Sequence, residues 1–223
     1  MGILTAVWHH AIEILLPSRC VGCGTGGTYL CDGCIGRAPR AAAVGLDTAG
    51  DALDAVTAPL AFEGTARTAV HRLKYSGLRA IAPAMARPMA EALSSAITSA
   101  DVVVPVPLHA SRERQRGFNQ ALAPARPVAE AVVLPVRDDL LRRLVAGTPQ
   151  VDARSADERR ENVAGAFGLA PGAGVAGLRI ILVDDVLTTG STLAAAASAL
   201  KRGGARSVHA LAFARGQLSQ DVD

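Results

Sequence analysis

RIILVDDVLTTGSTL, residues 179–193, joins a run of aliphatic residues to two adjacent aspartates and then to a loop of Thr, Gly and Ser. A short run of this kind, ended by turn-forming residues, is typical of a strand buried on both faces of a parallel sheet. In such sheets, ligands bind beyond the carboxyl ends of the strands. The stretch therefore predicts an α/β fold with Asp184 and Asp185 at the binding rim.

The acid pair has two interpretations. One aspartate can cap the next helix, but adjacent side chains on a strand point in opposite directions, so capping explains only one of them. The following loop supplies hydroxyl and backbone N–H groups at a helix N-terminus, a site suited to one phosphate; it comprises Thr188, Thr189, Gly190, Ser191 and Thr192. The P-loop pattern is missing, and no G-x-G-x-x-G follows a predicted strand. A phosphorylated sugar is the favoured ligand.

Length and composition agree with this fold class. The chain has 223 residues, of which 50% are hydrophobic and only 3% aromatic, which favours Ala-rich helices around Val/Ile strands over an all-β protein. Helices are predicted over residues 65–77, 78–97 with breaks near Pro83 and Pro88, 117–132, and 191–205. Strands are predicted over 101–108, the end of 134–144, 165–170, 179–186 and 207–215.

The first residues carry the longest apolar stretch, but His9, His10 and Glu13 interrupt it. No run approaches the roughly 20 residues of a membrane span, and no signal-peptide pattern is present. Residues 1–16 predict an amphipathic helix that packs on its own protein, with contact at a membrane surface as the weaker alternative. The net charge of +3 permits phosphate binding without requiring a nucleic acid. A cytoplasmic location is expected.

Four cysteines form two C-x-x-C pairs in a glycine-rich segment: Cys20, Cys23, Cys31 and Cys34. Disulfides are rare in a reducing compartment, and a thioredoxin-like redox motif would need a single pair that opens a helix. Four thiolates suit a structural Zn²⁺ ion, which would fold a segment too short for its own core. We expect a zinc module over residues 17–38, a linker over 39–55 and the main domain over 56–223.

The stretch at 180–192 resembles the signature of type I phosphoribosyltransferases, which use 5-phosphoribosyl 1-pyrophosphate (PRPP). Four further pieces, spread over nearly the whole chain, resemble the ComF family of competence-related proteins: the paired C-x-x-C module, HRLKYSG, VPVPLHASRERQRGFNQ and TPQVDARSADERRENVAGAF. The resemblance implies a mostly parallel sheet flanked by helices, a small zinc-ribbon-like module at the N-terminus, and a link to DNA uptake.

The resemblance also implies roles for individual residues. Asp184 and Asp185 would accept the ribose hydroxyls, and the 188–192 loop would bind the 5-phosphate. The pyrophosphate would lie against Pro107, Leu108 and His109, with Arg116 as a further phosphate ligand and Mg²⁺ bridging pyrophosphate and ribose oxygens. A flexible hood over 143–162 would contribute Thr148, Gln150, Arg154 and Arg159.

Two classes of function follow. The favoured class is an enzyme that transfers the phosphoribosyl group of PRPP to a nucleophilic acceptor and releases pyrophosphate. The alternative is a non-catalytic accessory protein of natural transformation that binds PRPP and single-stranded DNA or competence proteins. Thr188 stands where purine-salvage transferases often carry an aspartate, which argues against hypoxanthine or guanine as acceptor. The acceptor and the oligomeric state are not specified by the sequence.

Overall fold

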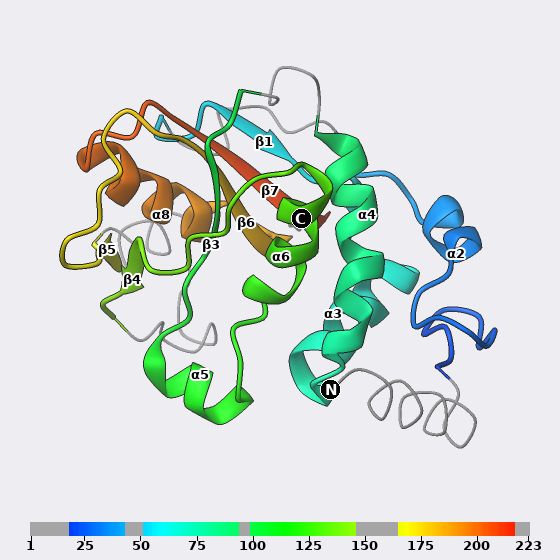
Figure 1. The fold of residues 1–223 in the computed structure, drawn as a ribbon. Helices are drawn as coiled ribbons and strands as arrows, with labels where there is room; N and C mark the ends of the chain where they lie inside the picture. The colour runs from blue at the N-terminus through cyan, green and yellow to red at the C-terminus, as the bar shows by residue number, and fades with distance from the viewer. Residues whose placement is uncertain (1–17, 43–50, 94–98, 146–164, 217–223) are drawn as a thin grey trace, which may run out of the picture.

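The computed structural model describes residues 18–42, 51–93, 99–145 and 165–216. Its centre is a parallel sheet in the order β1-β7-β6-β3 (Figure 1). The two central strands, β6 (Arg179–Leu187) and β7 (Ser207–Arg215), are nine residues long, and β3 spans Val102–Pro105. The predicted mostly parallel α/β fold is confirmed.

Both faces of the central strands are buried, and alternate residues enter two separate cores. On β6, Ile181 and Val183 join one hydrophobic cluster, whereas Ile180 and Leu182 join the other. This two-residue period follows from the pleat of the strand. Continuous aliphatic sequence is therefore required here, because every position meets a helical layer rather than solvent.

Helices cover the two faces (Figure 1). The first core contains residues of α3 (Gly64–Ser76), α4 (Ala82–Ala92) and α6 (Leu122–Ala131). The second core contains residues of α8 (Ser191–Arg202). A 3₁₀ turn, η2 (Arg79–Ile81), precedes α4, so the break predicted near Pro83 is the start of that helix. Pro88 lies inside α4 without ending it.

The sequence missed two short helices, α5 and the helix at Asp32–Arg37, and the edge of the sheet. α5 (Ala110–Arg116) buries none of its residues, so no hydrophobic period marks it. β1 (Ala55–Thr57) and β2 (Leu60–Ala61) both pair with β7 and form one edge interrupted before β2. Residues 39–41 of the expected linker hydrogen-bond to this edge, through Ala61 N–H to Pro39 O at 2.8 Å and Ala41 N–H to Pro59 O at 3.3 Å.

Two strands that were predicted do not join the main sheet. β4 (Leu141–Arg143) and β5 (Phe167–Leu169) pair with each other, antiparallel, as a separate two-stranded sheet. Their side chains Leu141 and Phe167 belong to the same core as α8. This two-stranded sheet therefore packs in the core that contains α8, and its strand β4 carries Arg143, whose charge acts on Asp184.

The first described residues form a small module whose helix, α2 (Asp32–Arg37), lies beyond α3 and α4 from the sheet (Figure 1). Leu30 and Ile35 of this module belong to the same hydrophobic cluster as Ala66 and Val70 of α3. The module is thus docked on the main domain. Within the described residues, no helix is both long and apolar enough to cross a membrane. Residues 1–16 lie outside the described part.

Candidate functional site

The acid pair lies inside β6, because the strand continues through Leu187. Asp185 is contacted from the α3 side by Lys74, and Asp184 lies under the influence of the charge of Arg143 on β4. Asp184 is 9% exposed and Asp185 2% exposed. The aspartates therefore lie near the carboxyl end of the strand, as predicted, and the strand holds both of them in the interior.

Asp185 is paired with a lysine from α3. Lys74 Nζ lies 2.8 Å from Asp185 Oδ1, and the lysine side chain is 21% exposed. The second oxygen of Asp185, Oδ2, is buried and accepts no hydrogen bond from the described residues. An orphaned buried oxygen on a charged group is costly unless a ligand supplies a donor, so this atom marks a place for a hydroxyl or amine.

Asp184 is held differently. Its Oδ1 accepts a hydrogen bond of 2.8 Å from the backbone N–H of Asp185. Burial, followed by the neighbouring Asp185 carboxylate, raises the pKa of Asp184 from 3.8 to about 7, although the charges of Lys74 and Arg143 oppose the rise. Arg143 is half-buried over the Phe167 ring, with its guanidinium carbon 5.2 Å from the ring centroid. The pair is therefore a desolvated acidic centre bordered by cations.

The expected pyrophosphate loop lies next to the acid pair. Pro105 pairs with Val183 in the sheet, and Val106 N–H donates to Val183 O at 2.8 Å. The chain then passes through Pro107, Leu108 and His109, which are partly exposed. His109 caps α5, since its Nδ1 accepts from the backbone N–H of Ser111 at 3.3 Å. The loop therefore begins beside the end of β6, next to Asp184, and it ends at His109, the N-cap of α5.

The RGFNQ segment holds this loop in place. Asn119 donates from Nδ2 to Val106 O at 3.0 Å and accepts from Ala121 N–H at 3.0 Å. Arg79 donates to Gly117 O at 2.8 Å, and its guanidinium lies 4.4 Å from the Phe118 ring centroid. Gly117 has φ 75°, a conformation that glycine adopts without strain. Asn119 was not singled out from the sequence, although its position two residues after Gly117 suits a turn-locking amide.

Arg116 ends a row of neighbouring planar groups that we call the ring stack: Phe62, His71, Tyr75 and Arg116. Their successive contacts are 6.3 Å between the Phe62 and His71 rings, 5.3 Å between His71 and Tyr75, and 5.6 Å from the Arg116 guanidinium to the Tyr75 centroid. Tyr75 is 71% exposed. Arg116 also donates to Gln120 Oε1 at 2.9 Å. Tyr75 of the ring stack directly follows Lys74 on α3.

The Thr/Gly loop connects β6 to α8 as predicted. Gly190 has φ 77° at the N-cap position, and Thr189 Oγ1 lies 2.9 Å from Ser191 Oγ. These two hydroxyls and the first-turn N–H groups of α8 present donors at the positive end of a 12-residue helix. The predicted phosphate-binding residues Thr188, Thr189, Gly190, Ser191 and Thr192 therefore span the end of β6 and the first turn of α8. The hood residues Thr148, Gln150, Arg154 and Arg159 lie outside the described residues.

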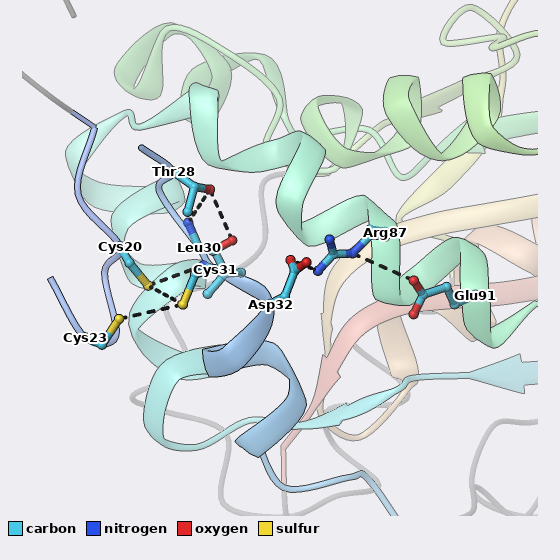
Figure 2. A network of polar contacts seen from close by, with 8 residues as sticks. All are labelled: Cys20, Cys23, Thr28, Leu30, Cys31, Asp32, Arg87 and Glu91. Carbon is cyan, nitrogen blue, oxygen red and sulfur yellow. Dashed lines mark hydrogen bonds and ion pairs between the residues drawn. The ribbon is translucent and has the colours of Figure 1, made fainter. Parts of the chain in front are cut away.

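The four cysteines converge on one point, as Figure 2 shows for three of them. Their sulfur atoms all lie within 4.8 Å of one another, and the Sγ atoms of Cys20 and Cys31 are 3.6 Å apart. Burial raises the pKa of Cys34, and its neighbouring thiols add to the effect, to about 12. Although burial opposes it, hydrogen bonds from the Cys31, Cys23 and Gly22 backbone lower the pKa of Cys20 to about 6. Four such sulfurs can ionise together only around a cation, so the donor set fits a thiolate-bound metal.

The cysteine cluster is in close contact with α3. A Cβ added at Gly22 would lie 2.8 Å from Cys34 Sγ and 2.9 Å from Thr65 Cγ2, so only glycine allows this approach. Figure 2 also shows Asp32 of α2 pointing at Arg87 of α4, with which it forms an ion pair. Arg87 in turn lies 3.7 Å from Glu91. The module is thus fixed to α3 and α4, two of the three helices that line one face of the sheet.

Comparison with known proteins matches residues 119–223, which include β6, its acid pair and the Thr/Gly loop, to the family described as "Phosphoribosyl transferase domain". This part of the chain is similar to phosphoribosyl transferase domains. It is 35% identical over 151 residues to the DNA utilization protein YhgH of Salmonella typhi, an alignment that covers 66% of this chain and 65% of the relative. It is 34% identical over 116 residues to Competence protein F of Haemophilus influenzae, covering 52% of this chain and 50% of the relative. The resemblance to the ComF family is confirmed.

Solved structures resemble the phosphoribosyl transferase domain more distantly. The glutamine PRPP amidotransferase of B. subtilis, complexed with ADP and GMP, matches with a TM-score of 0.38 and 24% identity, over 57% of this chain and 25% of that protein. TT1426 from Thermus thermophilus matches with a TM-score of 0.37 and 19% identity, over 63% of this chain and 85% of that protein.

The buried acid pair should make the ligand-free protein less stable at neutral pH. A carboxyl whose pKa is raised on folding keeps its proton in the folded state and loses it in the unfolded state between pH 3.8 and about 7, so stability falls as pH rises through this range. We expect Asp184→Asn to remove this slope and to raise the melting temperature at pH 8 by at least about 2 °C, the shift that about 1 kcal/mol gives in a chain of this size.

Asp139→Asn is the matched control, because Asp139 is exposed and pairs with Arg137 at 2.6 Å. Thermal unfolding of the three proteins from pH 5 to pH 8 measures the effect. A lower melting temperature for Asp184→Asn than for wild type at pH 8 would contradict the prediction.

Proposed function

We propose that this protein binds PRPP and transfers its phosphoribosyl group to an acceptor, releasing pyrophosphate. The observation that carries the proposal is the buried acid pair, with an Asp185 oxygen that lacks a donor, placed directly before a hydroxyl-rich loop at the N-terminus of α8. Carboxylate oxygens suit the ribose hydroxyls, and the loop suits the 5-phosphate. Pro107, Leu108 and His109 would face the pyrophosphate from the neighbouring strand end.

In the proposed reaction, a bond forms between the acceptor nucleophile and ribose C1 while the bond from C1 to the pyrophosphate oxygen breaks and its electrons leave with pyrophosphate. The side chains described here position the ribose and its phosphate, which is the main contribution that a protein can make to such a displacement. Arg116 and Arg143 are cations near the site that complement phosphate charge. Mg²⁺ would accompany the pyrophosphate and neutralise its charge.

The hood, residues 143–162, would close the site against water. Its polar contacts with the ligand would come from Thr148, Gln150, Arg154 and Arg159. The acceptor is left open, because Thr188 offers no carboxylate for a purine proton. The names of the relatives, a DNA utilization protein and a competence protein, support a role for this transferase in handling DNA that enters the cell.

PRPP binding is tested by calorimetry and thermal shift with PRPP and Mg²⁺. For wild type at 100 times Kd we expect stabilisation by about 2.7 kcal/mol, or roughly 5–10 °C. Asp185→Asn should weaken binding by at least about 10-fold, since it removes a charged acceptor. Asp139→Asn, which removes an exposed carboxylate, should bind as wild type does. If wild type gives no heat of binding with PRPP and Mg²⁺, the proposed PRPP binding is refuted.

A second measurement separates an enzyme from a binding protein. It follows the release of pyrophosphate from PRPP in the presence of a panel of bases and amines.

The second candidate function is binding of single-stranded DNA, which the ring stack favours. Single-stranded nucleic acids bind to exposed aromatic rings and arginine planes with which their bases stack. Tyr75 and His71 are exposed, and the row ends in the Arg116 guanidinium. This function is compatible with PRPP binding, and the relatives' names support it in the same way.

The ring stack gives a direct test of DNA binding. Tyr75→Ala should weaken the binding of a pyrimidine oligonucleotide by about 5- to 100-fold, the effect of losing one stacked base, whereas Tyr75→Phe keeps the ring and should bind as wild type does. Fluorescence anisotropy across salt concentrations measures both variants. Equal affinities for wild type and Tyr75→Ala would remove this candidate.

We also propose that the four cysteines hold a structural Zn²⁺ ion. Four thiolates leave no coordination position for a substrate, so the ion would fold and dock the module rather than act in the reaction. Cys23 is exposed and adds little to the core, whereas Cys20 and Cys34 are buried. Substitution of Cys23 therefore tests metal binding with the least disturbance of packing.

Purified protein should contain about one zinc ion per chain. Removal of the ion by a chelator, or Cys23→Ser, should lower the melting temperature of the whole chain, because the module shares a hydrophobic cluster with α3. Elemental analysis and calorimetry provide the measurements, and re-addition of zinc to wild type should restore stability. Far less than one equivalent of metal, or an unchanged melting temperature after its removal, would be evidence against the site.

A further inference from the structure

Asp184 and Asp185 are the buried charged residues among those that the structure describes, and their partners can be identified element by element. From α3, Lys74 Nζ lies 2.8 Å from Asp185 Oδ1. The charge of Arg143, which is half-buried on β4, opposes the rise in the pKa of Asp184. Burial, followed by the charge of Arg112 on α5, lowers the pKa of Arg143. Lys74 is therefore the cation in direct contact with the pair within the described part of the chain.

Lys74 occupies one specific oxygen. Each aspartate has one oxygen engaged inside the protein: Oδ1 of Asp185 with Lys74, and Oδ1 of Asp184 with the N–H of Asp185 at 2.8 Å. Asp185 Oδ2 remains buried without a donor from the described residues. The arrangement presents one remaining oxygen on each of two adjacent carboxylates, which matches the number of hydroxyls in a vicinal diol.

The lysine is held by the helix that carries it. Leu73, its neighbour, is completely buried, and Gly77 ends α3 with φ 63° and donates to Arg72 O. At the other end of α3, Thr65 contacts the cysteine module where Gly22 approaches it. Lys74 thus projects from a helix fixed at both ends, so its ammonium group has a defined position relative to β6.

A neutral side chain at position 74 would leave two adjacent carboxylates in the interior without that contact. Removing one partner of a buried ion pair leaves an uncompensated charge, and the usual response is uptake of a proton. Burial and Asp185 already raise the pKa of Asp184, and Lys74 opposes this rise. A protonated pair would offer fewer acceptors to hydroxyl donors.

We propose that Lys74 is a positioning residue that fixes Asp185 through Oδ1 and opposes protonation of the neighbouring Asp184, so that the remaining carboxylate oxygens can accept the two hydroxyls of a ribose. The proposal rests on the proposed binding of PRPP. It assigns a role to the HRLKYSG segment, which contains Lys74. Lys74 and its partner Asp185 are 111 positions apart in the sequence.

The test uses Lys74→Met, which keeps the length of the side chain and removes its charge, and Lys74→Arg, which keeps the charge. The sequence contains one other lysine, Lys201, which also pairs with an aspartate, at 2.7 Å from Asp54 Oδ2. Lys201→Met is therefore a matched control at a distant ion pair. Lys74→Gln, which keeps a hydrogen-bond donor without charge, replaces Lys74→Met if that variant does not fold.

PRPP affinity with Mg²⁺ is measured by calorimetry between pH 6 and pH 9. We expect Lys74→Met to bind about 10- to 100-fold more weakly at pH 7, the effect of a lost charged hydrogen bond, and to recover as pH rises and the acid pair loses its proton. Lys74→Arg and Lys201→Met should follow the wild-type pH profile. Unchanged affinity for Lys74→Met overturns the proposal. A loss that is equal at every pH also overturns it, because it would place Lys74 in contact with the ligand.

A measurement without ligand separates this proposal from PRPP binding itself. The pH range over which ligand-free stability falls should move upward in Lys74→Met and stay in place in Lys201→Met. If wild type binds no PRPP but this shift occurs, the proposed function fails and the role of Lys74 in ionising the pair stands. If wild type binds PRPP and the shift is absent, the role of Lys74 fails.

Discussion

Two neighbouring carboxylates held out of water on a central strand are the constraint around which the rest of the site is arranged. Asp184 and Asp185 are both buried near the end of β6, and their charged partners come from different elements. Lys74 reaches Asp185 from α3 on one side. Arg143 faces Asp184 from β4 on the other. The acid pair therefore ties both helical layers to the binding rim.

β6 is easy to recognise from the sequence, whereas several other strands are not. β6, α8 and β7 follow from local sequence, because aliphatic runs and an Ala-rich helix bounded by glycines determine them without long-range information. β1 and β2 are short and lie around Pro59, so they lack a pattern of their own and depend on pairing with β7. β4 and β5 have strand-like sequence, but no local signal says that they pair with each other rather than with the main sheet.

Much of the candidate site could also be predicted from the sequence. The acid pair, the Thr/Gly loop, the strand end before Pro107 and the cysteine cluster each occupy one short stretch whose residue types indicate their chemistry. Lys74 and Asn119 could not be assigned in this way, because their partners, Asp185 and the Val106 carbonyl, are distant in sequence or belong to the backbone. α5 was missed because a helix with no buried residue has no hydrophobic period to detect.

The unpartnered oxygen of Asp185 has an evolutionary consequence. A folded chain that keeps two buried carboxylates side by side at neutral pH is less stable than the same chain with an asparagine in place of one of them, and most proteins have little stability to spare. A lineage that stopped using this rim would gain by substituting either aspartate, and single-base changes would suffice. That both aspartates, and the lysine that meets them, stand together in this sequence is the pattern that continuing selection for a bound ligand would leave.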